Sequence, residues 1–534
     1  MAREGGPVDD GIVQEAVLAA GMPFGDHMVL QRQKEIAIWG TGRPGSTVAI
    51  TLADDESVRT TIASDGTWST SLPPHEAGHD LRLTLADERT QIVFTDVAIG
   101  EVWLAGGQSN MEYFLAFDAD RRDVLNRSAN PDIRYFDSPR TSYEGQLEEY
   151  DYSRFGFWRT STPEDLPYFS AVGYYFAAQV QASLGVPVGI VGCNWGGTPA
   201  CAWMSEQYLE AGEGRIWLDE HRTVLAGLDV DRVSAEYRAD PANAVTDPLR
   251  PSLLTLILSP GLPRLAQKAL VALAGRRLTE FTIGPLHPWR PAGLYEVMLK
   301  RIAPYTTRGV IWYQGESDAP HAEIYADVFS SMIRCWRDLW REEMPFLFAQ
   351  LAPFGEWLGA TGEAFPELRR QQQIVADTVP STWMASSSDA GLQWDIHPKR
   401  KEPIGERLAL LARHHVYGQR ISGNPPRFLS GRRTREGIEV RFTAAEGLRL
   451  GQGTVPLDVR SPSGRSIPVT GLHVEGDHLA VSGSFPPGSV VSFAWTGYYD
   501  VPLVNGAGNP VTPFQFALPV TSRPVPPRAY SDAG

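Results

Sequence analysis

The chain has 534 residues and a formal net charge of −15, and 43% of its residues are hydrophobic and 21% charged. This composition is typical of a folded globular protein and argues against a disordered one, while the length predicts two to four domains. The negative charge argues against nucleic acid or an anionic membrane as the main partner. The sequence has no run of about 18 apolar residues, so we expect no membrane-spanning helix.

The N-terminal residues bear on where the protein is located, and the cysteines bear on whether it has disulfides or a zinc site. Residues 1–20 carry acidic side chains where a signal peptide needs a long apolar stretch, so we expect a cytoplasmic protein unless a leader has been removed. We interpret residues 1–23 as an N-terminal extension. The three cysteines, Cys193, Cys201 and Cys335, have no Cys-x-x-Cys spacing, so neither a disulfide framework nor a zinc site is expected.

Residues 24–99 have the pattern of a small antiparallel β domain. The stretches "STVAITL" (46–52) and "LRLTL" (81–85) alternate apolar and polar residues, as half-buried strands do. Asp65 and Gly66 suit a tight turn between strands. Because no segment with helical periodicity interrupts this region, we predict a sandwich-like domain.

Residues 100–421 alternate short apolar runs with helical segments, which is the pattern of a three-layer α/β domain. The segment 240–283 is apolar and broken by prolines, and we interpret it as an irregular insert. The runs predicted to be buried parallel strands are 102–106, 186–192, 309–315, 345–351 and 382–388. The segments predicted to be helices are 168–185, 322–341 and 366–379.

Residues 424–520 return to a β pattern and predict a C-terminal β domain. "GIEVRF" (437–442) alternates apolar and polar residues, and "SVVSFAW" (489–495) follows it. The Pro- and Gly-rich "SGNPP" (422–426) marks the boundary. We predict that the tail, residues 521–534, is disordered.

Polar clusters follow three of the predicted parallel strands. They are "GGQSN" (106–110), "CNWGG" (193–197) and "QGESD" (314–318). Active sites of open parallel sheets lie at the carboxyl ends of the strands, so these clusters are expected to meet. A fourth cluster is "DIHP" (395–398).

The clusters contain the groups that a serine hydrolase needs. Ser109 follows a strand end beside glycines, His397 could be its base, and Asp395 could orient that base. Each also has a purely structural interpretation: Ser109 in a turn, His397 at the surface or in a cap, residues 195–197 as a plain turn, and residues 314–318 as a helix cap. The sequence has no Gly-x-Ser-x-Gly, so the nucleophile elbow of an α/β-hydrolase is not supported.

Five blocks in chain order resemble the sialate O-acetylesterase family of carbohydrate acetylesterases. Residues 25–48 and 498–516 resemble the N- and C-terminal β segments of the family, so the resemblance spans about residues 22–518. The blocks are "GEVWLAGGQSNMEY" (100–113), "NWGGTPACAW" (194–203), "GLYEVML" (293–299), "GVIWYQGESDA" (309–319) and "DIHPKRKEPIGERLAL" (395–410).

The resemblance implies an SGNH-hydrolase three-layer parallel-sheet core flanked by N- and C-terminal β-sandwich-like domains. It makes Ser109 the nucleophile, His397 the base and Asp395 the orienting acid. No metal or organic cofactor is implied. The implied oxyanion donors are Ser109, Gly196 or Gly197, and Gln314, and possible substrate contacts are Gln108, Asn110, Trp195 and Glu316.

The chain also departs from the family pattern. The acid and base are spaced Asp-x-His where many SGNH enzymes have Asp-x-x-His, so Asp389 or a backbone carbonyl could orient His397 instead. Asp318 stands where the family often has Asn, and Tyr113 where it often has Trp.

The resemblance predicts a carbohydrate O-acetylesterase that acts through a serine acyl-enzyme on an acetylated sugar. One alternative is an acetylxylan, xyloglucan-oligosaccharide or general short-chain esterase, and another is a catalytically inactive carbohydrate-binding protein. Arg400 and Lys401 could make the pocket basic, but charged residues after a turn are expected to be solvated. The sequence makes no prediction of the oligomeric state.

Overall fold

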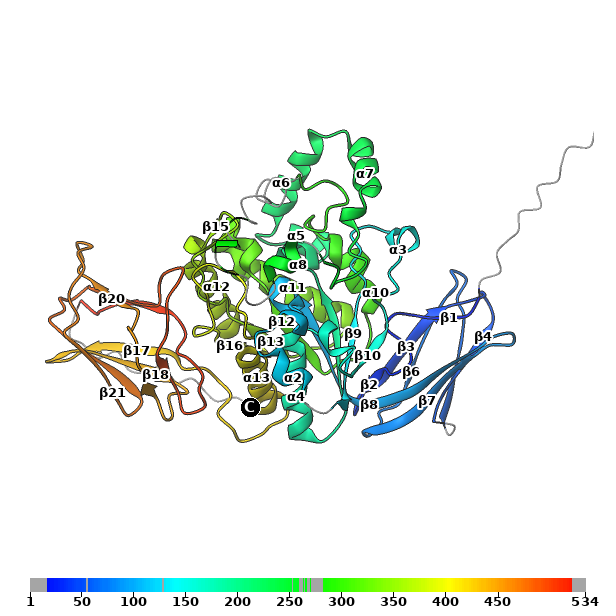
Figure 1. Ribbon diagram of the computed structural model, residues 1–534, viewed down its shortest axis with the longest axis horizontal. Helices are drawn as coiled ribbons and strands as arrows, with labels where there is room; N and C mark the ends of the chain where they lie inside the picture. The colour runs from blue at the N-terminus through cyan, green and yellow to red at the C-terminus, as the bar shows by residue number, and fades with distance from the viewer. Residues whose placement is uncertain are drawn as a thin grey trace, which may run out of the picture.

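The structure is a computed structural model that describes residues 17–520 apart from 54–55, 127–128, 252, 259–262, 264, 267–268 and 270–281. The predicted disordered tail, most of the predicted N-terminal extension and part of the predicted insert therefore lie outside the described residues. The chain has a mixed α/β fold with several sheets (Figure 1).

The centre of the molecule is a largely parallel sheet in the order β10-β9-β11-β8-β12-β13-β16. Each neighbouring pair is parallel except β10 with β9, which is antiparallel. The five runs predicted as parallel strands lie in this sheet. Its strands are β8 (Gln91–Gly107), β9 (Asn130–Asp137), β10 (Trp158–Ser161), β11 (Val188–Asn194), β12 (Gly309–Tyr313), β13 (Phe346–Ala349) and β16 (Thr382–Ala385).

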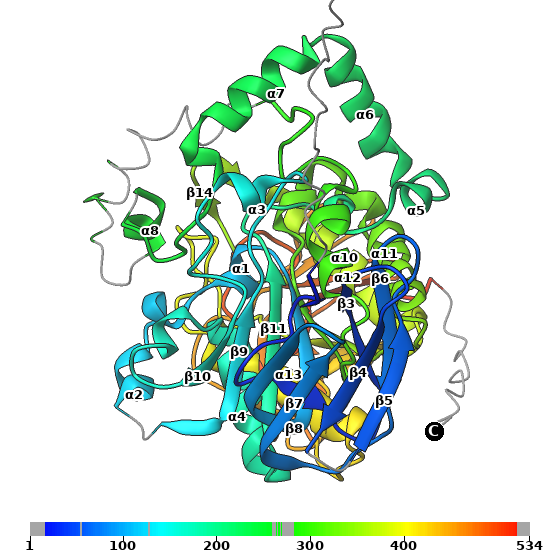
Figure 2. The same ribbon diagram turned by 90° about the vertical axis from the view of Figure 1, so that its right-hand side faces the viewer.

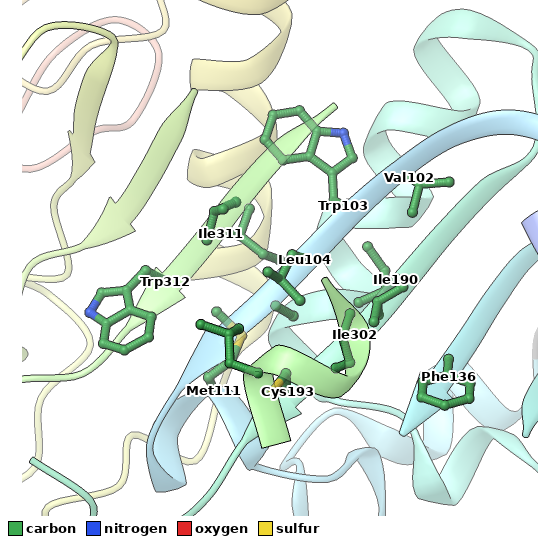
Figure 3. Close-up of a cluster of buried hydrophobic side chains, with 14 of the residues drawn as sticks. Val102, Trp103, Leu104, Met111, Phe136, Ile190, Cys193, Ile302, Ile311 and Trp312 are labelled. Atoms are coloured by element: carbon green, nitrogen blue, oxygen red, sulfur yellow. The ribbon is translucent and has the colours of Figure 1, made fainter. Parts of the chain in front are cut away.

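Helices pack against both faces of this sheet. Trp103 of β8 contacts Phe176 of α4, with ring centroids 5.0 Å apart, and Trp312 of β12 contacts Trp336 of α11 at 5.5 Å. Trp312 pairs in register with Gly106, which lies three positions after Trp103 on β8. Because side chains alternate between the two faces along a strand, Trp103 and Trp312 lie on opposite faces of the sheet (Figure 3). The main covering helices are α4 (Ala171–Leu184), α11 (Tyr325–Trp340), α12 (Phe365–Thr378) and α13 (Glu402–Leu411).

The ends of α4 show how the sequence sets a helix. The Ser170 hydroxyl accepts a hydrogen bond from the N–H of Gly173 and caps the first turn. Gly185 ends the helix with φ +67°, a left-handed conformation that glycine adopts without a Cβ clash. The helix predicted over 168–185 is confirmed, with these two caps inside its bounds.

The N-terminal strands continue into the central sheet through β8. The first half of β8 pairs with β7 and β2, so eleven strands form one sheet and the predicted domain boundary at 99/100 falls inside a continuous strand. The burial pattern of β8 changes three residues before that boundary, from alternating over Gln91–Asp96 to fully buried from Val97 onward. The other N-terminal strands are β1 (Ala19–Ala20), β2 (Val29–Gln31), β3 (Ile36–Thr41), β4 (Thr47–Leu52), β5 (Glu56–Thr61), β6 (Thr67–Leu72) and β7 (Gly78–Ala86).

The C-terminal strands pack around a hydrophobic cluster of their own. They lie at the opposite end of the molecule from the N-terminal strands, with the central sheet between them (Figure 1). They form sheets of four, three and two antiparallel strands. The strands are β17 (Arg427–Arg433), β18 (Gly437–Thr443), β19 (Arg449–Leu450), β20 (Leu457–Arg460), β21 (Gly471–Glu475), β22 (His478–Ser482), β23 (Val490–Phe493), β24 (Leu503–Val504) and β25 (Phe514–Ala517).

Two helices that the sequence analysis did not predict, α6 (Arg215–Ala226) and α7 (Val230–Ala239), project beyond the carboxyl end of the central sheet (Figure 2). The remaining α-helices and one hairpin are short: α1 (Ser109–Glu112), α2 (Arg121–Leu125), α3 (Gln146–Glu149), α5 (Glu206–Glu210), α8 (Leu253–Leu258), α10 (Lys300–Ile302), β14 (Glu356–Trp357) and β15 (Ala360–Thr361). The 3-10 and π segments are η1 (Leu115–Phe117), η2 (Leu166–Tyr168), η3 (Ala200–Trp203), η4 (Pro241–Asn243), η5 (Tyr295–Leu299), η6 (Glu316–Ile324), η7 (Gly362–Ala364) and η8 (Ala412–Val416). Within the described ranges, no helix combines the length and apolarity needed to span a membrane.

Candidate active site

The three polar clusters meet because their strands end in register. Gly107, the last residue of β8, pairs with Asn194 at the end of β11 and with Tyr313 at the end of β12. Gly107 has φ +137°, and a Cβ there would lie 2.3 Å from the carbonyl oxygen of Tyr313, so only glycine fits. Ser109 follows as the first residue of α1, at the edge where the sequence predicted it.

Ser109, His397 and Asp395 form a line of contacts. His397 Nε2 lies 3.0 Å from Ser109 Oγ, and His397 Nδ1 lies 3.1 Å from Asp395 Oδ1. The same carboxylate oxygen accepts the backbone N–H of His397 at 2.9 Å. A proton on Nδ1 facing Asp395 leaves Nε2 free to accept the hydroxyl proton of Ser109, which is the tautomer a general base needs.

Burial and neighbouring charges prepare this histidine to act as a neutral base. Burial lowers the pKa of His397, although the hydrogen bond and charge of Asp395 oppose that shift. Burial alone would raise the pKa of Asp395, but the hydrogen bond from His397 and the charges of His397 and Lys399 bring it well below its usual value. Asp395 therefore stays ionised beside a neutral imidazole.

The alternative acid from the sequence, Asp389, lies elsewhere. Its two carboxylate oxygens accept hydrogen bonds of 2.6 and 2.7 Å from the guanidinium of Arg407. The imidazole Nδ1 faces Asp395 instead. The spacing Asp-x-His is therefore compatible with contact between acid and base, because both side chains point to the same side of the 395–397 segment.

Two aromatic rings enclose the imidazole of His397. Tyr113 lies roughly parallel to it, with centroids 6.2 Å apart, and the ring of Trp357 stands perpendicular to it at 4.9 Å. Tyr113 is buried, and its hydroxyl donates to the carbonyl of Phe117 at 2.8 Å. Trp357 comes from the β14–β15 hairpin and is half-buried.

The predicted oxyanion glycines differ in their hydrogen bonding. The N–H of Gly196 donates to the carboxylate oxygen Oε2 of Glu112. In the described part of the chain, no acceptor is present for the N–H of Gly197, which has φ +78° and is half-buried. A Cβ at Gly197 would lie 2.8 Å from the indole of Trp289, which therefore borders this turn.

Gln314 lies at the end of β12 and is fully buried. Its Nε2 donates to the carbonyl of Thr198 at 3.2 Å and to Asp318 Oδ2 at 2.5 Å, while Oε1 accepts the hydroxyl of Tyr325 at 3.0 Å. Both amide hydrogens thus have protein acceptors, and one of them must be released before Gln314 can bind an oxyanion. Burial raises the pKa of Asp318 to about 7.

The residues predicted as possible substrate contacts are mostly occupied by protein partners. Gln108 Oε1 accepts the N–H of Ser317 at 3.3 Å. Asn110 Nδ2 donates to Glu316 Oε1 at 2.5 Å and to the carbonyl of Ile396 at 3.2 Å. Trp195 is 9% exposed. Contact of these residues with substrate stays a prediction.

The two basic residues after His397 differ from the expectation that both are solvated. Arg400 is exposed and pairs with Asp120 at 2.8 Å, as expected. Lys401 is fully buried, and its Nζ donates to Asn110 Oδ1 at 2.5 Å. The expectation was wrong for Lys401 because α1 and the 395–401 segment pack together, which a local charge pattern cannot show.

Three residues at this site were not singled out from the sequence. Glu112 accepts from Gly196, Trp357 packs on His397, and Lys399 pairs with Asp395 at 2.8 Å. Only Lys399 had a local signal, since it stands four residues after Asp395. Among the described side chains, no group of three or more His, Cys, Asp or Glu is arranged to hold a metal ion.

The chain is similar to known carbohydrate esterases. Residues 269–411 match the family model described as "Carbohydrate esterase, sialic acid-specific acetylesterase". The resemblance to the sialate O-acetylesterase family is confirmed. The sialate O-acetylesterase of Mus musculus is 27% identical over 439 residues, covering 74% of this chain and 73% of the mouse protein, and that of Homo sapiens is 26% identical over 427 residues, covering 74% and 70%.

Similarity to a solved carbohydrate acetylesterase extends over almost the whole chain. The crystal structure of a carbohydrate acetylesterase from Xanthomonas citri matches with a TM-score of 0.73 and 28% identity, covering 94% of this chain and 99% of that one. This coverage includes strands on both sides of the central sheet.

Proposed function

We propose that the protein is a carbohydrate O-acetylesterase that hydrolyses acetyl esters on sugar hydroxyls through an acyl-enzyme on Ser109. The observation that carries the proposal is the line of contacts from Ser109 Oγ through His397 to Asp395. We also propose that residues 100–421 form an SGNH-hydrolase core and that residues 24–99 and 424–520 form the flanking β domains.

In the first half of the reaction, Ser109 Oγ attacks the acetyl carbonyl carbon and its proton passes to His397 Nε2. The carbonyl oxygen becomes an oxyanion at the edge of the sheet, where the N–H of Ser109, the 196–197 turn and Gln314 are the candidate donors. The C–O bond to the sugar then breaks, and His397 returns the proton to the departing sugar oxygen.

In the second half, water attacks the acetyl group on Ser109 while His397 takes a proton from it. The tetrahedral intermediate collapses to acetic acid, which ionises to acetate in solution, and the proton on His397 returns to Ser109 Oγ. Asp395 keeps the proton of the resting imidazole on Nδ1 and stabilises the imidazolium in both halves. No step in this sequence requires a redox change or an external acid.

The direct test is acetate release from p-nitrophenyl acetate by the wild type and by Ser109→Ala, followed by a panel of acetylated xylo-oligosaccharides and O-acetylated sialic acid. Activity in the wild type and none in Ser109→Ala supports the proposal, and the panel then identifies the sugar. Equal inactivity of both proteins on every ester would contradict it in favour of a binding protein. Activity on small esters alone would identify a general short-chain esterase.

A further inference from the structure

A carboxylate accepts the hydrogen bond of one of the two glycine N–H groups near Ser109. Glu112 ends α1, three residues after Ser109, and its Oε2 accepts the N–H of Gly196. A Cβ built on Gly196 would lie 3.1 Å from Glu112 Oε2 and 3.3 Å from Ser109 Cβ. The carboxylate and the nucleophile therefore border the same space beside Gly196.

The turn that contains these glycines is fixed on its other sides by hydroxyl groups. The Thr198 hydroxyl donates to the carbonyl of Trp195 at 2.7 Å, and the Ser317 hydroxyl donates to the carbonyl of Gly197 at 2.7 Å. With the N–H of Gly196 held by Glu112, the N–H of Gly197 is the one amide of the pair without an acceptor among the described residues. An unpaired donor at a half-buried position is ready for a developing oxyanion.

A buried arginine lies behind the Glu112 carboxylate. Arg140 is fully buried, with Nε 3.5 Å from Glu112 Oε1 and Nη2 3.6 Å from Asp137 Oδ1. None of its three nitrogens has a hydrogen-bond partner among the described groups, so the nearby carboxylates and the rings of Phe114 and Phe155 under the guanidinium hold it there. A carboxylate next to an oxyanion would repel it, and the guanidinium offsets that repulsion.

We infer that Glu112 is a positioning residue of the oxyanion site: it holds the amide of Gly196, so that the N–H of Gly197 becomes the glycine donor, and Arg140 neutralises its charge. This inference rests on the proposed function, since an oxyanion forms only if Ser109 attacks an ester. It assigns one role to each of the two glycines that the sequence left as alternatives.

The opposite interpretation of the same contact is a gate, in which Glu112 blocks the site until substrate displaces it. The two interpretations predict opposite effects of removing the carboxylate. If Glu112 is a positioning residue, removing its carboxylate lowers the activity. If it is a gate, removing the carboxylate raises the activity.

The experiment compares Glu112→Ala and Glu112→Gln with the wild type and with Glu296→Ala, which removes an exposed glutamate that pairs with Lys300. We expect Glu112→Ala to lower kcat on p-nitrophenyl acetate by about 30–100-fold, somewhat less than the loss of a whole oxyanion donor, with KM within about twofold. Glu112→Gln should keep most of the wild-type kcat, because the amide oxygen of glutamine can still accept the N–H of Gly196. Glu296→Ala should match the wild type.

A second measurement separates positioning from general loss of structure. An alkylboronic acid that adds to Ser109 forms an anionic tetrahedral adduct, so its inhibition constant should rise in Glu112→Ala roughly in step with the fall in kcat. Inhibition by acetate should not change. Unchanged or higher activity in Glu112→Ala, or equal losses in both Glu112 variants with unchanged boronate inhibition, would overturn the inference. A wild type without Ser109-dependent activity would instead refute the proposed function.

Discussion

Lys399 Nζ lies 2.8 Å from Asp395 Oδ2, while His397 contacts the other carboxylate oxygen, Oδ1. Asp395 thus bridges the imidazole and an ammonium group. The positive charge of Lys399 lowers the pKa of Asp395 and also contributes to lowering the pKa of His397. Lys399 therefore helps to keep the base neutral as the pH falls.

Lys399→Met should shift the pH profile of the esterase. Only the neutral imidazole can accept the Ser109 proton, so activity is lost as the pH falls through the pKa of His397. Removing the Lys399 charge raises that pKa, so the acid limb of kcat/KM should move to higher pH by up to about one unit. Lys300→Met, which removes a lysine that pairs with exposed Glu296, should leave the limb in place. A limb that stays fixed or moves to lower pH in Lys399→Met would show that Lys399 does not act on the base.

The triad residues should differ in the size of their effects. Ser109→Ala and His397→Ala should each lower kcat by about 10⁶-fold, and Asp395→Ala by about 10⁴-fold, since the acid only orients and stabilises the imidazole. Asp389→Ala should keep kcat per folded molecule but lower Tm, because it leaves the buried guanidinium of Arg407 without its carboxylate. Loss of kcat in Asp389→Ala with retention in Asp395→Ala would exchange their assignments.

Gln314→Ala tests the side-chain donor predicted for the oxyanion. If its amide turns from Asp318 to the oxyanion during the reaction, kcat should fall by about 10²–10³-fold with little change in KM. The matched control is Gln371→Ala, which removes a buried amide on α12 that donates to the carbonyl of Glu323. It should leave kcat unchanged. Full activity in Gln314→Ala would show that Gln314 is not an oxyanion donor and that its amide only forms the hydrogen bond to Asp318.

The sequence could predict the parts of the site that depend on strand ends and short spacing. Ser109, the 195–197 turn and Gln314 each follow a buried apolar run, and the parallel register brings those runs to one edge. Asp395 and His397 are two residues apart, so their proximity is local. Together with the five strands and three helices of the core, these features follow from periodicity and from the edge rule for parallel sheets.

The features that the sequence could not predict depend on side chains that meet across long stretches of chain. Glu112 and Gly196 are 84 residues apart, and Lys401 is buried against Asn110, 291 residues away. The continuity of β8 across the expected boundary at 99/100 also depends on distant contacts. The first part of β8 pairs with β2 and β7, and its last part pairs with β11 and β12. No local propensity encodes such contacts.

Trp357→Ala should weaken the use of sugar esters while sparing small ones. His397 Nε2 returns its proton to the departing sugar oxygen, so the sugar must lie beside the imidazole, and Trp357 is the half-buried ring that borders it there. Loss of an aromatic surface against a sugar ring should raise KM for an acetylated oligosaccharide by about tenfold, with kcat/KM for ethyl acetate within about twofold. Phe157→Ala, which removes another partly exposed ring, should change neither value. Equal losses on both esters would instead mean that Trp357 acts on the imidazole itself, by holding its orientation against Ser109.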